Sequence, residues 1–308
     1  MSLDDDTAEP PLVAVNLAAG LAELAKTMPT DLRTREDISR YRAAGAVGGT
    51  SAPAVAAACD LTWEEQQTSS GCPMTIFRPM RCTARAIVLF LHGGGLVAGN
   101  RFDGADVIGR HANELGLEVR TLEYPLAPEF TFDEMIRAAR DALSACARTA
   151  LPVVIAGQSG GGCLAAATAI DARDHDVPLA GQLLVCPMLD RRPTPSRLQY
   201  AAAPPWSAQS DATAWRMALA GSRTRPPGER DDLTGLPPTF LDTGTAELFR
   251  DAIIGYAERL CAAGVSTELH MWSGAFHGSD CVIEDAAVSR QQHHARADWL
   301  RRLVDGEL

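Results

Sequence analysis

The sequence predicts an α/β fold built on a mostly parallel, doubly wound sheet. Three observations support this prediction: short apolar runs alternate with helical patterns, the runs contain few polar residues, and glycine-rich turns follow two of them. Strands that alternate with helices form βαβ units, whose sheet is buried on both faces. The runs predicted as strands are residues 86–91, 117–122, 152–156, 182–186, 239–242 and 268–272.

Helical patterns separate these runs, and the chain before them has a different character. The predicted helices are residues 104–115, 131–148, 161–173, 250–263 and about 284–304. Residues 61–68 and 74–78 alternate in polarity, as antiparallel edge strands do. Residues 11–48 have apolar side chains near helical spacing, whereas the Gly/Ala/Pro-rich residues 48–58 are expected to form a linker.

One proline-rich segment interrupts the alternation of strands and helices. Residues 191–238 contain four pairs of closely spaced prolines and a single helical stretch, around 207–220. Insertions after a strand commonly lie over the carboxyl ends of the sheet, where ligands bind. We therefore divide the chain into an N-terminal helical unit, residues 1–48, and an α/β domain, residues 49–308, which contains an insertion at 191–237.

Composition excludes several functions. The 308 residues carry a net charge of −11 and include one lysine, Lys26, so nucleic-acid binding, which needs clustered basic residues, is excluded. The acidic N-terminus does not resemble a secretory signal, and the apolar stretch at 11–25 is shorter than the ~20 residues of a membrane span. Eight scattered cysteines without a C-x-x-C pair indicate reduced thiols and no metal site. We expect a cytoplasmic protein.

The strongest motif is the G-x-S-x-G sequence at 157–161, which follows a predicted strand and opens a predicted helix. A tight strand-to-helix turn exposes the serine oxygen, and glycines leave room on both sides of it. The helix N-terminus presents unpaired N–H groups to a developing oxyanion. The bare pentapeptide also fits an ordinary glycine-rich turn, but its position favours Ser159 as a nucleophile.

A second motif, His92-Gly93-Gly94-Gly95, ends another predicted strand and fits the HGGG pattern, which supplies backbone N–H donors to an oxyanion. Glycines let the backbone itself approach the substrate oxygen. The same stretch formally satisfies the dinucleotide fingerprint G-x-G-x-x-A. No helix opens at Gly95, and no acidic residue ends a strand about 20 residues later, so nucleotide binding is disfavoured.

A nucleophilic serine needs a general base, and the base needs an orienting carboxylate. His277 follows the predicted strand ELHMW and Glu247 follows TFLDTG, so both belong to the edge where Ser159 is expected. Asp251 is the alternative acid, but one turn into a helix it would rather stabilise the helix N-terminus. The histidines expected on solvated helix surfaces are His111, His293 and His294. The order Ser159, Glu247, His277 is that of one fold family.

Together the motifs resemble the hormone-sensitive-lipase-like branch of the α/β-hydrolase superfamily. The matching segments are HGGG at 92–95, YPLAPE at 124–129, GQSGG at 157–161, GTAELFRD at 244–251 and AFHG at 275–278. The resemblance implies that Ser159 is the nucleophile, His277 the base and Glu247 the acid. It also implies an oxyanion hole made by the N–H groups of Gly94, Gly95 and Gly160, and a helical cap formed by 1–48 and 191–237.

The resemblance implies a carboxylesterase, which cleaves short- to medium-chain acyl esters through an acyl-enzyme on Ser159. No cofactor or metal is expected, because the histidines do not cluster with cysteines or carboxylates at ligand spacing along the sequence. The sequence departs from the family at the acid, which is more often Asp, and has Pro125 and Gln158 where Arg and Asp are common. The side chains expected to line the substrate pocket are Met188, Leu189, Trp206 and Trp215. A small-molecule ester is the expected partner, and a homodimer through the last helix is left open.

Other functions use the same fold and stay open at this point. One is a catalytically silent ligand-binding protein, against which the complete set of three residues argues. The others are a thioesterase, lactonase, amidase or dehydratase, because the machinery is shared and the pocket decides the substrate.

Overall fold

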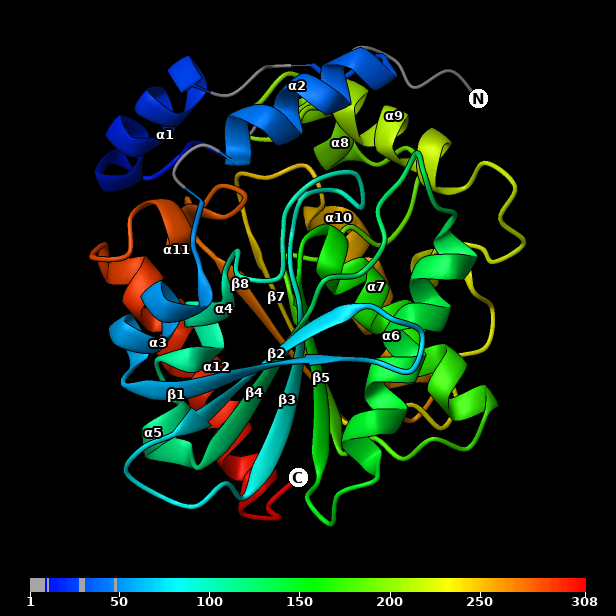
Figure 1. Ribbon diagram of the computed structural model, residues 1–308. Coiled ribbons are helices and arrows are strands. Elements are labelled where there is room, and N and C mark those ends of the chain that lie inside the picture. Colours follow the sequence, from blue (N-terminus) through cyan, green and yellow to red (C-terminus); the bar gives the residue numbers. More distant parts are fainter. Residues whose placement is uncertain (1–8, 10, 28–30, 47–48) are drawn as a thin grey trace.

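The computed structural model describes residues 9, 11–27, 31–46 and 49–308. In them one sheet has the order β1-β2-β4-β3-β5-β6-β7-β8 (Figure 1). The strands are β1 (Leu61–Gln67), β2 (Pro73–Pro79), β3 (Ala86–Leu91), β4 (Leu117–Leu122), β5 (Val153–Gln158), β6 (Gly181–Val185), β7 (Thr239–Gly244) and β8 (Thr267–Trp272). Strands β3 to β8 pair in parallel, whereas β2 is antiparallel to both of its neighbours. The predicted fold class is confirmed, but of the two strands expected at an edge only β1 is one, because β2 lies inside the sheet.

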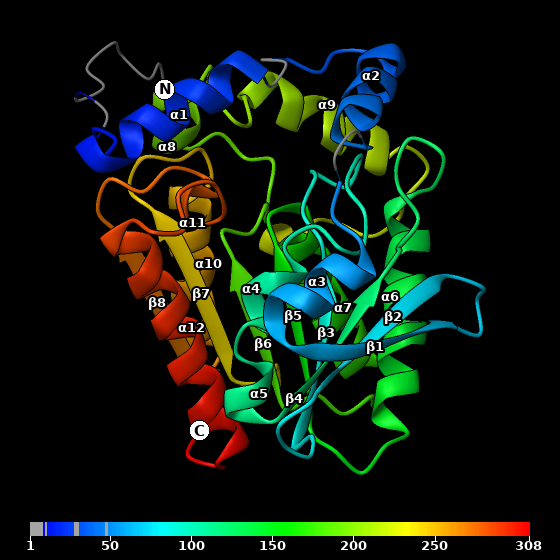
Figure 2. The ribbon, with the colours of Figure 1, turned by 60° about the vertical axis from the view of Figure 1, so that its left-hand side comes forward.

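Helices cover both faces of the sheet, which explains why the central strands are apolar throughout. Helices α6, α7 and α10 cover one face, and α3, α4, α5 and α12 cover the other (Figure 2). Ile87 and Leu89 of β3 pack with the first set, whereas Val88 and Phe90 pack with the second. Successive side chains of a strand point to opposite faces, so a doubly covered strand has no polar side. These helices are α3 (Ala52–Cys59), α4 (Ala105–Gly109), α5 (Ala112–Leu115), α6 (Phe132–Ala147), α7 (Gly160–Asp174), α10 (Arg250–Ala262) and α12 (Ala287–Val304).

The remaining helices lie beyond the carboxyl ends of the parallel strands. Helices α1 (Val15–Thr27) and α2 (Arg35–Ala46) lie beside α8 (Pro195–Gln199) and α9 (Ala208–Ala218), at the top of both views (Figures 1 and 2). Helix α11 (Ser279–Val282) lies just below α1, with which it is in contact. We refer to α1, α2, α8 and α9 as the cap helices. Of the N-terminal unit predicted at 1–48, residues 1–8, 10, 28–30 and 47–48 lie outside the described residues.

The cap helices join through hydrogen bonds between distant parts of the sequence. The backbone N–H of Leu32 donates to Ser210 Oγ at 2.9 Å, and Ser207 Oγ donates to a carboxylate oxygen of Asp31 at 2.7 Å. Arg42 of α2 reaches the domain below, donating to the carbonyl oxygens of Val97 and Ala127 at 2.6 Å each. The two segments separated in sequence therefore form one layer above the sheet.

Three local predictions were wrong. The expected linker at 48–58 contains α3, where Pro53 lies in the first turn and Val55 and Cys59 are buried against the sheet. The helix expected at 104–115 is two short helices, because the chain turns between Gly109 and Ala112. The insertion contains α8 and a short 3₁₀ turn, η1 (Pro227–Glu229), in addition to the expected helix. In the first case burial of apolar side chains outweighed composition.

Candidate active site

Ser159 occupies a sharp turn between β5 and α7. Its φ of 54° and ψ of −117° are unusual for a residue with a side chain, and its N–H donates to the Val185 carbonyl at 2.9 Å. A Cβ on Gly157 would lie 2.2 Å from the carbonyl oxygen of Gly161, and one on Gly161 would lie 2.1 Å from that of Leu91. The two flanking glycines are therefore required by contact between backbones, as expected for an exposed nucleophile on such a turn.

The glycine loop after β3 lies against this turn. A Cβ on Gly160 would lie 2.7 Å from the backbone nitrogens of both Gly95 and Leu96. Gly94 and Gly95 have φ of 107° and 62°, which point successive peptide groups in directions that other residues rarely allow. Within the described residues, the N–H groups of Gly94, Gly95 and Gly160 donate no hydrogen bond to another backbone group. The backbone nitrogen of Gly95 therefore lies against the turn that carries Ser159, without a backbone acceptor of its own.

Ser159, His277 and Glu247 form a hydrogen-bonded chain, although they come from three separate loops. His277 Nε2 lies 2.9 Å from Ser159 Oγ, and Nδ1 lies 3.1 Å from Glu247 Oε2. The Glu247 carboxylate is wholly buried and the His277 side chain is 12% exposed, so only the base and the serine approach solvent. Phe249 packs edge-on against the imidazole at 5.1 Å. With Nδ1 donating to the carboxylate, Nε2 is left as an acceptor for the serine proton.

Two neighbours of Glu247 were missed by the sequence analysis. Thr243 Oγ1 donates to Glu247 Oε1 at 2.5 Å, so the two carboxylate oxygens have different partners. Cys186, directly after β6, places its sulfur within 4.8 Å of donor atoms of Glu247 and His277. Both residues end or follow buried strands, the same signal that identified Glu247. The fold thus brings together a histidine, a cysteine and a carboxylate that lie far apart in the sequence.

A buried ionic network supports this edge from below. Arg296 of α12 donates from Nε to Asp242 Oδ2 at 2.8 Å and also pairs with Asp280 of α11. Burial opposes its charge, yet the two carboxylates hold the pKa of Arg296 above its usual value. Asp242 in turn accepts from the backbone N–H of Cys186 at 3.3 Å. The network thus links α12 to the strand ends that carry Glu247 and Cys186.

The pocket residues predicted from the sequence have different surroundings. The N–H of Met188 donates to the Ser159 carbonyl at 3.0 Å, and Leu189 follows it, fully buried. The Trp206 ring lies directly over Gly95, since a Cβ there would be 2.3 Å from it. Trp215 instead packs edge-on against Phe132 of α6 at 6.1 Å. Met188 and Trp206 therefore adjoin the serine and the glycine donors, whereas Trp215 belongs to the packing of α9 on α6.

The other candidates from the sequence lie elsewhere. Asp251 accepts from the backbone N–H of Ser196 at 2.7 Å and so ties α10 to α8. His92 is fully buried and stacks on Tyr124 at 4.2 Å, and burial lowers its pKa. His294 is exposed as expected, but His293 is 5% exposed, so its placement on a solvated surface was wrong.

A separate depression opens beside α6, and its lining does not include Ser159, His277 or Glu247. Its volume is about 920 Å³, and its lining includes Arg42, Cys72, Tyr124, Glu129 and Arg137. Arg42 and Glu129 pair with each other at 2.8 Å across its rim. Its lining contains no histidine, so no hydroxyl or thiol there has an imidazole beside it as Ser159 has.

Comparison with known proteins agrees with the geometry. A family profile described as "alpha/beta hydrolase fold" matches residues 88–280, so the chain belongs to this family. Esterase LipI of Mycobacterium tuberculosis is 32% identical over 66% of this chain and 69% of its own length. Carboxylesterase NlhH of the same species is 34% identical over 62% of this chain and 66% of its own.

Solved structures of esterases share the fold over nearly the whole chain. Esterase LipW from Mycobacterium marinum has a TM-score of 0.84 and 28% identity, covering 96% of this chain and 98% of its own. A bacterial heroin esterase has a TM-score of 0.82 and 31% identity, covering 95% and 98%. The resemblance stated from the sequence motifs is thereby confirmed.

Proposed function

We propose that the protein is a carboxylesterase in which Ser159 is the nucleophile, His277 the general base and Glu247 the acid that orients the base. The hydrogen-bonded chain from Ser159 through His277 to Glu247 carries the proposal, because each distance suits proton transfer or orientation. The esterase names of the relatives support the same reaction class.

The proposed reaction uses the side chains of this hydrogen-bonded series and begins at Ser159. Ser159 Oγ attacks the ester carbonyl carbon while Nε2 of His277 takes its proton. The N–H groups of Gly94, Gly95 and Gly160 bind the oxyanion, each contributing roughly 2.7–4 kcal/mol to the transition state. His277 returns the proton to the leaving alcohol, and the acyl group stays on Ser159. Water, deprotonated by the same imidazole, then releases the acid.

The cap helices and the insertion supply the proposed acyl pocket. Trp206 over Gly95 and Met188 beside Ser159 place apolar surface next to the oxyanion donors, which suits an uncharged acyl chain of short to medium length. Leu189 would extend this wall, and Trp215 would act only through the packing of α9. Residues 1–48 and 191–237 are accordingly proposed as a cap on the domain formed by the remainder of 49–308.

Ser159→Ala tests the proposal with p-nitrophenyl acetate, butyrate and octanoate as substrates. Loss of the nucleophile should lower kcat by about 10⁴-fold or more. Ser279→Ala is a matched control, since Ser279 is buried two residues beyond His277 and its Oγ lacks a hydrogen-bond partner in the described part of the chain. Equal slow rates in wild type and Ser159→Ala would contradict the proposal and favour a ligand-binding protein. Activity only on thioesters, lactones or amides would assign the protein to that substrate class in place of esters.

The same proposal includes a cellular compartment, a partner and an oligomeric state. In the described residues no helix is long and apolar enough to cross a membrane. All eight cysteines are free thiols, which supports a reducing, cytoplasmic compartment. The partner we propose is a small-molecule ester, and a homodimer through α12 stays a prediction that oligomeric state in solution would test.

A further inference from the structure

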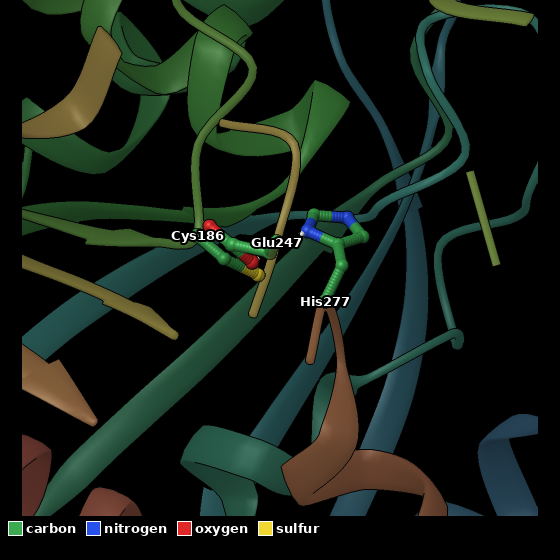
Figure 3. Close-up of side chains that lie close together, drawn as sticks. All are labelled: Cys186, Glu247 and His277. Carbon is green, nitrogen blue, oxygen red and sulfur yellow. Dashed lines mark hydrogen bonds and ion pairs between the residues drawn. The ribbon is translucent and has the colours of Figure 1, made fainter. Parts of the chain in front are cut away.

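Three donor groups of different chemistry meet behind the imidazole. Cys186, Glu247 and His277 follow the neighbouring strands β6, β7 and β8, and the close-up shows the thiol and carboxylate side by side, facing the ring (Figure 3). One ligand atom from each lies within 4.8 Å of the others. Within the described residues, no other group of three histidine, cysteine or carboxylate side chains meets this condition.

We propose that Cys186, Glu247 and His277 bind a thiophilic divalent cation such as Zn²⁺, and that the bound cation switches the general base off. Zn²⁺ takes thiolate sulfur, imidazole nitrogen and carboxylate oxygen as ligands in tetrahedral sites. Two ligands each about 2.0 Å from a tetrahedral Zn²⁺ are ~3.3 Å apart. The present separation of 3.1 Å between His277 Nδ1 and Glu247 Oε2 is close to that value.

The backbone at Cys186 is an independent indication. Its φ of 36° is in a region that residues with a side chain rarely adopt, and such outliers concentrate at functional sites. Hydrogen bonds hold it there, since its N–H donates to the Asp242 carbonyl at 3.1 Å and to Oδ1 of the same residue. From this position the thiol lies beside the Glu247 carboxylate (Figure 3).

Charge also favours a cation at this position. The Glu247 carboxylate is wholly buried, and the chain as a whole carries a net charge of −11. A low-dielectric site strengthens the attraction between a buried carboxylate and an incoming cation. The His277 ring is the most exposed part of the group, so entry requires that ring to turn outward.

Binding changes the protons on the site in a defined way. Zn²⁺ binds sulfur as thiolate, so formation of the Zn–S bond displaces the proton of the Cys186 thiol. Coordination by Nδ1 leaves the imidazole proton on Nε2, where it donates toward Ser159 Oγ. An Nε2 that carries a proton cannot accept the serine proton, so hydrolysis stops.

Zn²⁺ inhibition of p-nitrophenyl acetate hydrolysis tests the proposal, and the inhibition, unlike the binding, rests on the proposed function. EDTA-treated wild type should be inhibited and should recover when EDTA is added again. Cys186→Ser and Cys186→Ala, each compared with its own rate without metal, should need at least about tenfold more Zn²⁺, because one ligand is lost. Cys261→Ser is the control, since this thiol is exposed in the last turn of α10, away from the three ligands, and its loss should change nothing.

A direct measurement of metal binding tests the metal site separately from the esterase function. Co²⁺ added to Ser159→Ala, which does not turn over, should give thiolate-to-metal absorption that disappears in Ser159→Ala/Cys186→Ser. The band without any hydrolysis by wild type would preserve the site and reject the esterase. Hydrolysis without the band, or equal Zn²⁺ sensitivity of wild type and Cys186→Ser, would overturn the metal site.

Discussion

The carboxyl edge of the sheet and the cap helices above it are held in different ways. At the edge, Arg296 is 1% exposed and its two carboxylate partners are equally buried. In the cap, Arg42 has a side chain that is 28% exposed, and its partners include two backbone carbonyls. When a buried ion pair is broken, water cannot reach its charges to solvate them. When a partly exposed pair is broken, water solvates both charges.

This difference assigns the two regions different tasks. The proposed mechanism needs Ser159, His277 and Glu247 fixed to within a fraction of an ångström, and rigid strand ends provide that. Substrate entry needs a layer that can move at small cost, and the cap has the ties for it. Damage to the edge should therefore reduce stability and kcat, and damage to the cap should change KM.

Arg296→Met is the largest test of the edge. It leaves Asp242 and Asp280 buried without their cation, so the free energy of unfolding should fall by about 3–5 kcal/mol. Urea denaturation measures this. Arg301→Met, on the same helix but 43% exposed, should cost less than about 1 kcal/mol. Equal losses in the two variants would show that the edge is no more tightly held than the surface.

Acid should weaken the same edge through His293. Burial, followed by the nearby Arg296, lowers the pKa of His293 from 6.5 to about 4. Between those values the unfolded chain binds a proton that the folded chain does not, so stability falls as pH drops from 6.5 to 4. At about 1.4 kcal/mol per pH unit the loss reaches about 3 kcal/mol.

Substitution separates this contribution from the other titrating groups. Urea denaturation at pH 7 and at pH 4.5 should show a smaller acid-induced loss for His293→Gln than for wild type. His294→Gln, at the exposed neighbouring position, should behave as wild type. Identical pH dependence in the two variants would remove His293 from the account.

Thr243→Val sharpens the comparison within the edge. It removes the hydroxyl that donates to Glu247 Oε1 while keeping the shape of the side chain. We expect kcat to fall about tenfold, the equivalent of about 1.4 kcal/mol, with KM unchanged. Steady-state kinetics measure the split, and Thr243→Ser should restore kcat because it restores the hydroxyl. Failure of the serine variant to recover would indicate a packing role instead.

Arg42→Met is the smallest test and concerns the cap. Loss of its bonds to Val97, Ala127 and Glu129 should loosen α2, raise KM a few-fold and leave the free energy of unfolding within about 1 kcal/mol. Steady-state kinetics and urea denaturation check both. Arg40→Met, on the same helix with a side chain 79% exposed, is the control. A fall in kcat as large as that of Thr243→Val would show that the cap, like the edge, affects the chemical step, and would contradict the division of tasks.

The sequence predicted the edge better than the cap for a physical reason. Ser159, Glu247 and His277 each follow a buried strand, and parallel strands bring their carboxyl ends together, so position along the chain was sufficient. Cap contacts such as Leu32 to Ser210 join segments 178 residues apart, and no local pattern encodes them. Thr243 and Cys186 were missed because either residue can occur in a buried strand simply to pack the core.

The turn that holds Ser159 has an evolutionary consequence. A positive φ in a residue with a Cβ costs about 1–3 kcal/mol, whereas glycine adopts it without penalty. A descendant released from the demand for turnover would gain stability by exchanging this serine for glycine. The serine is thus kept against a steady thermodynamic pressure, and its persistence in a lineage would itself be a record of continuing selection for catalysis.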